Sequence, residues 1–116
     1  MFKLNVCNCG NAVQHARVEL PEKANIDAAA EIFKLCSDPT RASVLCALSS
    51  HSLCVCELAS VLDMSSSAIS HQLRMMKQMG LIASVREGKS VYYHIADKQI
   101  AEMFSLALSY TKEKNQ

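Results

Sequence analysis

The sequence predicts a mainly α-helical fold with a small β-hairpin, arranged as a winged helix-turn-helix. In three short segments, apolar residues recur with the period of an α-helix, 3.6 residues. In the stretch that follows, the period changes to two residues, as in a β-strand. The chain has 116 residues, half of them hydrophobic and 20% charged, which suits one compact domain with a short tail. We expect an arm over residues 1–20 and a folded domain over residues 21–116.

The N-terminal part is the least regular. Residues 1–20 are expected to be a mobile arm with at most a short helical turn near 13–20. After the arm, Asn25 or Asp27 is expected to cap a helix that continues to about Cys36, because apolar residues recur at helical spacing between them.

Sharper signals mark the next three helices. Asp38 followed by Pro39 is typical of a helix start, because the carboxylate accepts from free amides and proline lacks one. A short helix is expected over residues 55–62. Ser65 opens another, which Gly80 ends.

A hairpin and a final helix complete the predicted fold. Residues 81–85 and 91–95 are β-branched or aromatic, and the basic segment Arg86-Glu87-Gly88-Lys89 separates them. Asp97 then caps a helix with apolar residues on one side.

The helix that Ser65 opens carries an apolar stripe on one face and small polar or cationic side chains on the other. Such a polar face is most often simply solvated, but the basic hairpin that follows favours DNA binding. Residues 65–116 carry a net charge of +3 against −2 for residues 1–64, but this asymmetry alone does not decide for DNA binding. The candidate DNA-binding residues are Ser66, Ser67, Ser70, His71, Gln72, Arg74 and Lys77 on the helix, with Arg86 and Lys89 at the hairpin tip.

Four of the six cysteines form two Cys-x-Cys pairs, Cys7 with Cys9 and Cys54 with Cys56. No signal peptide or apolar span is apparent, so we expect a cytoplasmic protein whose thiols stay reduced. Four thiolates suit Cd²⁺, Pb²⁺ or Zn²⁺. Residues two apart point about 200° apart on an α-helix, so Cys54 and Cys56 converge only if the helix begins around them.

The remaining two cysteines, Cys36 and Cys46, lie within helical apolar stripes. We interpret both as small core residues.

Three segments carry a resemblance to a known family. They are Leu53-Cys54-Val55-Cys56-Glu57-Leu58-Ala59, Ser67-Ala68-Ile69-Ser70-His71-Gln72-Leu73-Arg74 and Glu87-Gly88-Lys89-Ser90-Val91-Tyr92-Tyr93. In this order and spacing they resemble the ArsR/SmtB family of metal-sensing repressors, most of all its CadC branch, over about residues 25–113. The resemblance implies a homodimer that binds operator DNA without metal and leaves it when Cd²⁺, Pb²⁺ or Zn²⁺ binds, which derepresses metal-resistance genes. It implies no enzymatic activity, no organic cofactor and no membrane partner.

The resemblance also implies where metal binds. In CadC-like regulators, arm cysteines of one subunit complete a site on the third helix of the other, which corresponds here to Cys7 and Cys9 with Cys54 and Cys56. The arm pair is more closely spaced than in CadC, so whether both thiols ligate or His15 substitutes stays open. The family's second site corresponds to Asp97, Gln99, Tyr110 and Glu113, where an amide and a phenol replace both imidazoles, and we expect it not to bind metal tightly.

Three other functions stay open at this point. Arsenite-sensing relatives use a third thiol at the position of Ala59, which disfavours but does not eliminate an arsenite response. A thiol-redox switch of the same fold could use Cys54 and Cys56 or an arm cysteine. A small thiol enzyme or metal-trafficking protein is disfavoured, because the sequence has no P-loop, no G-x-G-x-x-G and no C-x-x-C motif.

Overall fold

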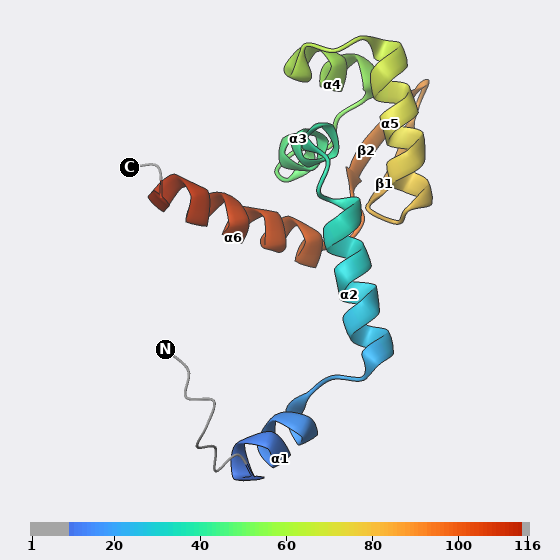
Figure 1. Ribbon diagram of the computed structural model, residues 1–116. Helices are drawn as coiled ribbons and strands as arrows, with labels where there is room; N and C mark the ends of the chain where they lie inside the picture. Colours follow the sequence, from blue (N-terminus) through green and yellow to red (C-terminus); the bar gives the residue numbers. More distant parts are fainter. Residues whose placement is uncertain (1–9, 115–116) are drawn as a thin grey trace. The chain divides into compact units, whose positions relative to one another are not determined.

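A computed structural model describes residues 10–114 of the chain (Figure 1). Its elements follow in the order α1 (Gly10–Glu19), α2 (Lys23–Leu35), α3 (Pro39–Leu48), α4 (Val55–Leu62), α5 (Ser66–Gln78), β1 (Ile82–Glu87), β2 (Ser90–Ile95) and α6 (Lys98–Lys114). Among residues 10–114, none of the helices combines the length and the apolar composition of a membrane span.

The chain divides into two compact units between Phe33 and Lys34. The first holds α1 and most of α2, and the second holds the end of α2 and all the later elements. The division into an arm over residues 1–20 and a domain over residues 21–116 stays a prediction.

The first unit is more helical than the sequence suggested. Helix α1 has ten residues, where only a turn near residues 13–20 was expected, and none of its residues is buried. Helix α2 begins at Lys23, so neither Asn25 nor Asp27 caps it. The carbonyl of Glu22 accepts hydrogen bonds from the N–H groups of Asn25 and Ile26, at 2.9 and 3.1 Å, and this closes the first turn before either expected cap.

The start of α3 confirms the sequence prediction. Asp38 has an extended backbone, and its carboxylate accepts a hydrogen bond from the backbone N–H of Arg41 at 3.0 Å. Pro39 occupies the first helical position, where its missing N–H costs nothing.

Helices α4 and α5 form the helix-turn-helix, and their boundaries agree with the prediction. The turn between them uses Asp63 in the left-handed region, with φ of 54°, and Ser65 as the cap of α5. The Ser65 hydroxyl accepts from the N–H of Ala68 at 3.1 Å. Gly80, with φ of 79°, provides the backbone conformation that turns the chain from α5 toward β1.

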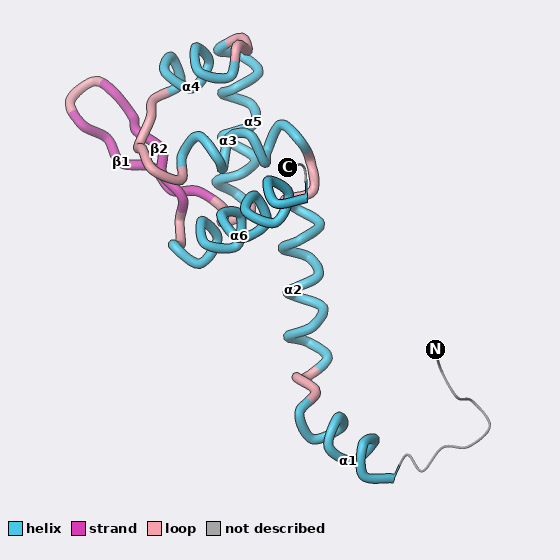
Figure 2. Tube along the Cα trace, turned by 90° about the vertical axis from the view of Figure 1, so that its left-hand side faces the viewer, coloured by secondary structure: helices cyan, strands magenta, loops and turns pink. Residues whose placement is uncertain are grey.

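Strands β1 and β2 form the expected antiparallel hairpin, in which Ser84 is paired with Tyr93 and Arg86 with Val91. Figure 2 shows the hairpin (magenta) extending from the helices of the second unit, as the wing of this fold. The turn at Gly88 and Lys89 is only two residues long, because Gly88 adopts a positive φ of 64°.

A β-bridge joins the segment before α4 to the wing. The N–H of Leu53 donates to the carbonyl of Tyr93 at 3.1 Å, and the N–H of Tyr93 donates to the carbonyl of Leu53 at 2.8 Å. Leu53 therefore acts toward β2 both as a hydrogen-bond donor and as an acceptor.

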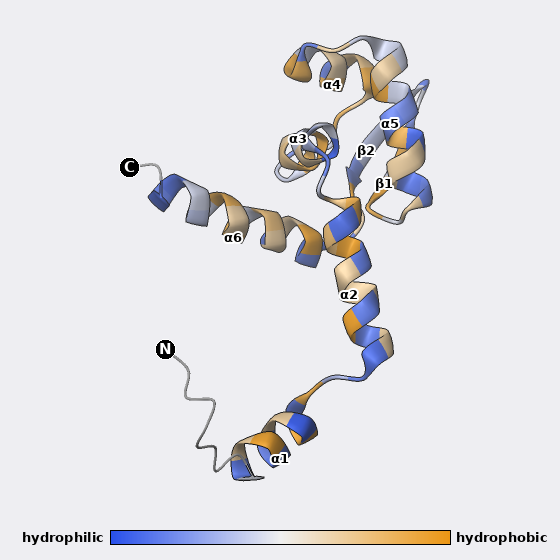
Figure 3. Cartoon of the chain, viewed as in Figure 1, coloured by the Kyte–Doolittle hydropathy of each residue, from blue (hydrophilic) through white to orange (hydrophobic). Residues whose placement is uncertain are grey.

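The core lies at the centre of the second unit, between α3, α4, α5 and β1. Its fully buried side chains are Val44, Leu45, Leu58, Ile69, Leu73 and Met76. Helix α4 packs on α3 and α5, α5 packs on β1, and α6 packs on α3 and β2. Figure 3 shows hydrophobic (orange) and hydrophilic (blue) residues alternating along α5, as expected for a helix with one buried face.

Candidate DNA-reading face and metal centre

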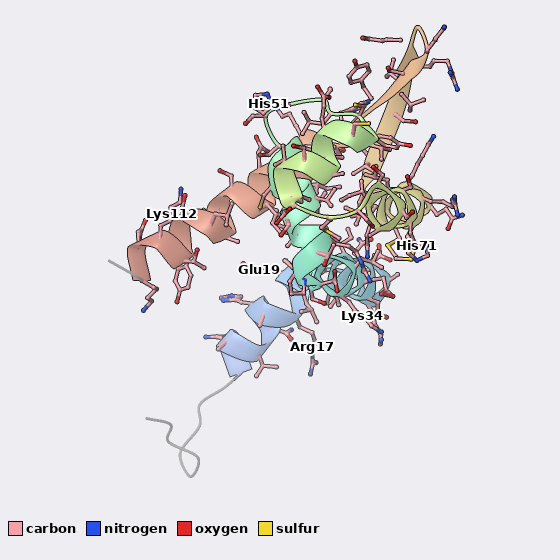
Figure 4. The ribbon with its side chains drawn as sticks, turned by 90° about the horizontal axis from the view of Figure 1, so that it is seen from above. Arg17, Glu19, Lys34, His51, His71 and Lys112 are labelled. Atoms are coloured by element: carbon pink, nitrogen blue, oxygen red, sulfur yellow. The ribbon has the colours of Figure 1, made fainter. Side chains whose placement is uncertain are left out.

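One face of α5 is polar and exposed. Ser67, His71 and Arg74 are exposed on it, opposite the buried Ile69 and its neighbours in the core. Figure 4 shows the His71 side chain projecting outward from the helix. Ser66 is exposed in the first turn, where free backbone N–H groups favour a phosphate. A face of this kind presents small hydrogen-bonding side chains with a cationic side chain beside them.

A cleft of about 570 Å³ lies between α5 and the wing. It is lined by Ser70, Leu73, Arg74, Lys77, Gln78 and Tyr93. Two of these side chains are cationic and none is acidic, so the cleft attracts anions. The Lys77 ammonium donates a hydrogen bond to the Ser84 hydroxyl at 2.7 Å, which ties α5 to β1 across the cleft's edge.

Gln72, like Ser70, differs from the exposed predicted DNA contacts on α5. It is half-buried, and its side-chain oxygen is enclosed without a hydrogen-bond partner among the described residues. This places Gln72 at the border of the buried stripe, apart from the exposed Ser67, His71 and Arg74.

The basic residues of the wing are solvent-exposed. Arg86 lies within β1 and Lys89 lies in the turn. The sequence placed both in one loop, but β1 extends to Glu87, so only Gly88 and Lys89 form the turn. Both cations lie on the same hairpin and are available to a phosphate backbone.

Cys54 and Cys56 lie where α4 begins. Cys54 caps the helix with φ of −88° and ψ of 175°, an extended conformation, and Val55 is the first helical residue. This is the local geometry that two thiols two residues apart require in order to converge. Cys54 is half-buried and Cys56 is exposed, and neither is in a disulfide.

Glu57 holds this helix start in place. Its carboxylate accepts a hydrogen bond from the backbone N–H of Cys54 at 3.0 Å. The sequence reasoning missed this role, although a glutamate three residues after a cap is a recognisable signal of a helix start.

The other cysteines occupy different environments. Cys36 is buried, as expected of a core thiol, and burial raises its pKa although Arg41 acts in the opposite direction. Cys46 is half-buried on α3. Cys7 and Cys9 lie outside the described residues. Within residues 10–114, no group of three or more His, Cys, Asp and Glu side chains is placed to hold a metal ion.

Comparison with known proteins identifies the family. Residues 38–84 match the family described as bacterial regulatory protein, arsR family. The chain is 34% identical over 106 residues to a "Transcriptional repressor SmtB homolog" of Synechocystis sp., covering 89% of this chain and 80% of that protein. The chain belongs to the ArsR/SmtB family.

Two further similarities agree with this assignment. A "Cadmium resistance transcriptional regulatory protein CadC homolog" of Staphylococcus aureus is 33% identical over 102 residues, 87% of this chain and 84% of that protein. The crystal structure of the AntR antimony-specific transcriptional repressor superposes with a TM-score of 0.77 at 30% identity, covering 84% of this chain and 89% of that one. The expected resemblance to the CadC branch of the ArsR/SmtB family and the expected winged helix-turn-helix are both confirmed.

The four positions expected to match the family's second metal site lie just before α6 and along it. The Asp97 carboxylate accepts from the backbone N–H of Gln99 at 2.8 Å and so caps the helix. Tyr110 lies at the other end, with the Lys114 ammonium 5.7 Å from its ring centre. Asp97 and Tyr110 lie roughly 20 Å apart along the helix, at 1.5 Å per residue, so one chain cannot bring the four positions together. Weak metal binding at Asp97, Gln99, Tyr110 and Glu113 stays a prediction.

Two further histidines, His51 and His94, lie outside these sites. His51 is exposed in the loop before α4 and is labelled in Figure 4. His94 is half-buried on β2, and its Nδ1 lies 3.1 Å from the carbonyl oxygen of Ile95.

Proposed function

We propose that this protein is a repressor that binds operator DNA as a homodimer and releases it when a thiophilic metal ion binds. The observation that carries the proposal is the position of Cys54 and Cys56. They flank the first residue of α4, and α4 packs directly on α5, the helix with the DNA-reading face.

The polar face of α5 and the wing support DNA binding. Ser67, His71 and Arg74 are exposed together, and they can reach base edges and phosphates in a major groove. Arg86 and Lys89 extend the cationic surface along the wing. Ser66, Ser70, Gln72 and Lys77 complete the proposed contact set.

Exposed apolar side chains support a homodimer. On α2, Phe33 is 61% exposed, and on α6, Leu106 and Tyr110 are 74% and 62% exposed. A second copy that covered such side chains would remove them from water. Helices α2 and α6 of two subunits therefore form the proposed interface, and each subunit supplies one α5 to an adjacent major groove.

The cysteine pair fits half of a thiolate site. Cys54 and Cys56 provide two sulfur donors at the N-terminus of α4. A tetrahedral Cd²⁺, Pb²⁺ or Zn²⁺ ion needs more donors than these two. Cys7 and Cys9 of the partner subunit are proposed to supply them, with His15 as the substitute if only one arm thiol ligates. A bound ion would supply strong bonds between these otherwise separate segments.

The consequence for DNA binding follows from the packing. When the arm of one subunit is tied to the start of α4 in the other, the bound ion sets a new position for α4. Because α4 packs on α5, α5 is displaced together with it. Two α5 helices must fit two half-sites at the same time, so a small change in their relative position weakens the complex. Linkage then requires DNA to weaken metal binding by the same factor.

A titration with a matched control tests the proposal. The gene's own upstream DNA is bound by the purified chain, and CdCl₂ is added while the complex and the thiolate-to-cadmium absorbance are followed. Cys54→Ser and Cys56→Ser are expected to abolish both the absorbance and the release, whereas Cys46→Ser on α3 leaves both intact. Wild-type protein that keeps its DNA at saturating Cd²⁺ overturns the proposal.

A second candidate function is a response to a trivalent metalloid, which the structural similarity to the antimony-specific AntR favours. Trivalent arsenic and antimony take three sulfur ligands, but the third position used on this helix by arsenite sensors is Ala59, which is buried. Adding antimonite or arsenite in place of Cd²⁺ distinguishes the two. Release by the metalloid alone supports the second candidate.

A thiol-redox switch stays the remaining alternative. Oxidation of Cys54 and Cys56, or of an arm cysteine, to a disulfide would release the DNA without any metal. Peroxide treatment of the complex in the presence of a chelator tests it, and an unchanged complex excludes it.

A further inference from the structure

The segment that carries the cysteines is attached to the wing as well as to α4. Leu53 immediately precedes Cys54, and two backbone hydrogen bonds join it to Tyr93 of β2, at 3.1 and 2.8 Å. A pair of backbone bonds fixes the spacing of two segments more rigidly than a side-chain contact does, because no rotatable side-chain bond intervenes. A displacement of Cys54 would therefore act on β2 through Leu53.

The wing is in turn attached to the DNA-reading helix. Tyr93 pairs with Ser84 across the hairpin, and the Ser84 hydroxyl accepts a hydrogen bond from the Lys77 ammonium at 2.7 Å. Lys77 belongs to α5. Two hydrogen-bonded pairs, Leu53 with Tyr93 and Ser84 with Lys77, thus meet at the facing residues Tyr93 and Ser84 and connect the cysteine segment through both strands of the wing to α5.

The side chain of Tyr93 adds a second connection. It lines the cleft between α5 and the wing together with Arg74 and Lys77, the cations next to the DNA-reading face. A shift of β2 would change the shape of this cleft and the positions of its cations relative to a DNA backbone.

We propose that Tyr93 and Ser84 are positioning residues through which the occupancy of Cys54 and Cys56 sets the placement of the wing against α5, an inference that rests on the proposed function. In the free protein, the series Leu53–Tyr93–Ser84–Lys77 holds the wing and α5 in the spacing that fits DNA. When Cys54 and Cys56 are drawn toward the arm, Leu53 moves β2, and the wing no longer fits the backbone beside the groove that α5 occupies.

Removing the Ser84 hydroxyl tests this inference. Ser84→Ala deletes the acceptor of the Lys77 bond and retains every cysteine and every side chain of the proposed DNA contact set, Lys77 included. Ser90→Ala is the matched control, because Ser90 is an exposed serine of the same hairpin without a side-chain hydrogen bond among the described residues. Three quantities are measured for each protein: CdCl₂ affinity by thiolate absorbance, operator Kd without metal, and operator Kd at saturating CdCl₂.

The expected result is specific to the coupling between the two sites. Ser84→Ala keeps the wild-type cadmium affinity, and its metal-free operator Kd stays within about threefold of the wild-type value, since one exposed hydrogen bond is lost. The ratio of the two operator Kd values falls by about fivefold or more, within the usual size of allosteric couplings. Ser90→Ala keeps the wild-type ratio. An unchanged ratio in Ser84→Ala overturns the inference.

A measurement without DNA provides the second test. On addition of CdCl₂ to ¹⁵N-labelled wild-type protein, the amide signals of Leu53, Tyr93 and Ser84 are expected to shift, and the same signals in Cys54→Ser are not. If the thiolate absorbance appears but the signals of Tyr93 and Ser84 do not shift, the inference is overturned and the proposed function is not. Absence of the thiolate absorbance in wild-type protein overturns the proposed function, so the two failures are distinguishable.

Discussion

The carboxylate of Glu57 accepts a hydrogen bond from the backbone N–H of Cys54, with 3.0 Å between the two atoms. This bond satisfies an N–H group that the helix itself leaves free, and it fixes the residue that carries one of the two candidate metal-ligand thiols. The stability of α4 and the geometry of the proposed metal site therefore depend on one carboxylate.

Replacing Glu57 is expected to affect both properties. Glu57→Ala should lower the free energy of unfolding by about 1 kcal/mol, the usual cost of losing a cap. It should also weaken Cd²⁺ binding by about tenfold, because the ligand segment loses its support. Glu57→Gln, which keeps an acceptor oxygen, is expected to recover most of both, and Glu102→Ala on α6 serves as the control. Equal Cd²⁺ affinities in all four proteins would show that Glu57 does not support the site.

The two faces of α4 should respond very differently to truncation. Leu58 is completely buried, whereas Val61 on the same helix is 62% exposed. Leu58→Ala is expected to lower the free energy of unfolding by about 2–5 kcal/mol through lost burial and a cavity. Val61→Ala should change it by about 0.5 kcal/mol or less. Urea unfolding followed by circular dichroism measures both, and a similar loss in the two variants would contradict the assignment of the buried face.

Salt dependence should reveal the phosphate contacts of α5. Arg74 is exposed beside the cleft between α5 and the wing. Arg74→Ala is expected to weaken binding to all DNA sequences alike and to reduce the slope of log K against log salt by about one. Lys112→Ala, near the end of α6, should leave the slope unchanged (Figure 4 shows the position of Lys112). Fluorescence anisotropy at several salt concentrations gives the slopes. If Arg74→Ala keeps the wild-type slope, Arg74 makes no phosphate contact.

Thiol reactivity should follow burial. Cys36 is only 8% exposed, and burial raises its pKa, so both its accessibility and its thiolate fraction are low. Cys56 is exposed at the start of α4. Iodoacetamide at neutral pH is expected to modify Cys56 long before Cys36, as peptide mass spectrometry can show. Because the folded-state pKa of Cys36 is raised, its reaction should become faster as the pH increases above neutrality. CdCl₂ should protect Cys54 and Cys56 and leave the rate at Cys36 unchanged.

Local signals in the sequence determined most of the secondary structure. Asp38 with Pro39, Ser65 and Gly80 mark helix ends because each acts on backbone groups within a few residues of itself. The change of period after Gly80 revealed the hairpin for the same reason, since pleated strands alternate their side chains with no help from distant residues. Each Cys-x-Cys pair is visible in the sequence as a candidate site, because only one residue separates its two cysteines.

The sequence was less informative where a contact is made by backbone groups or depends on packing, because no side-chain pattern indicates such a contact. Helix α2 begins at Lys23, ahead of Asn25 and Asp27, because the carbonyl of Glu22 closes its first turn, and a carbonyl is present at every residue. Gln72 was grouped with Ser67 and His71 by spacing, but only the packing of α5 shows that its side-chain oxygen is enclosed.

Only the tertiary structure decided how the cysteine segment relates to the wing. Leu53 and Tyr93 are joined by backbone groups across forty residues of sequence, and Lys77 reaches Ser84 only because the chain reverses at Gly80. Hydrogen bonds between distant segments depend on how the whole chain packs, so no local pattern encodes them. The sequence by itself determined which residues can bind metal and DNA, and the fold decided which hydrogen bonds connect them.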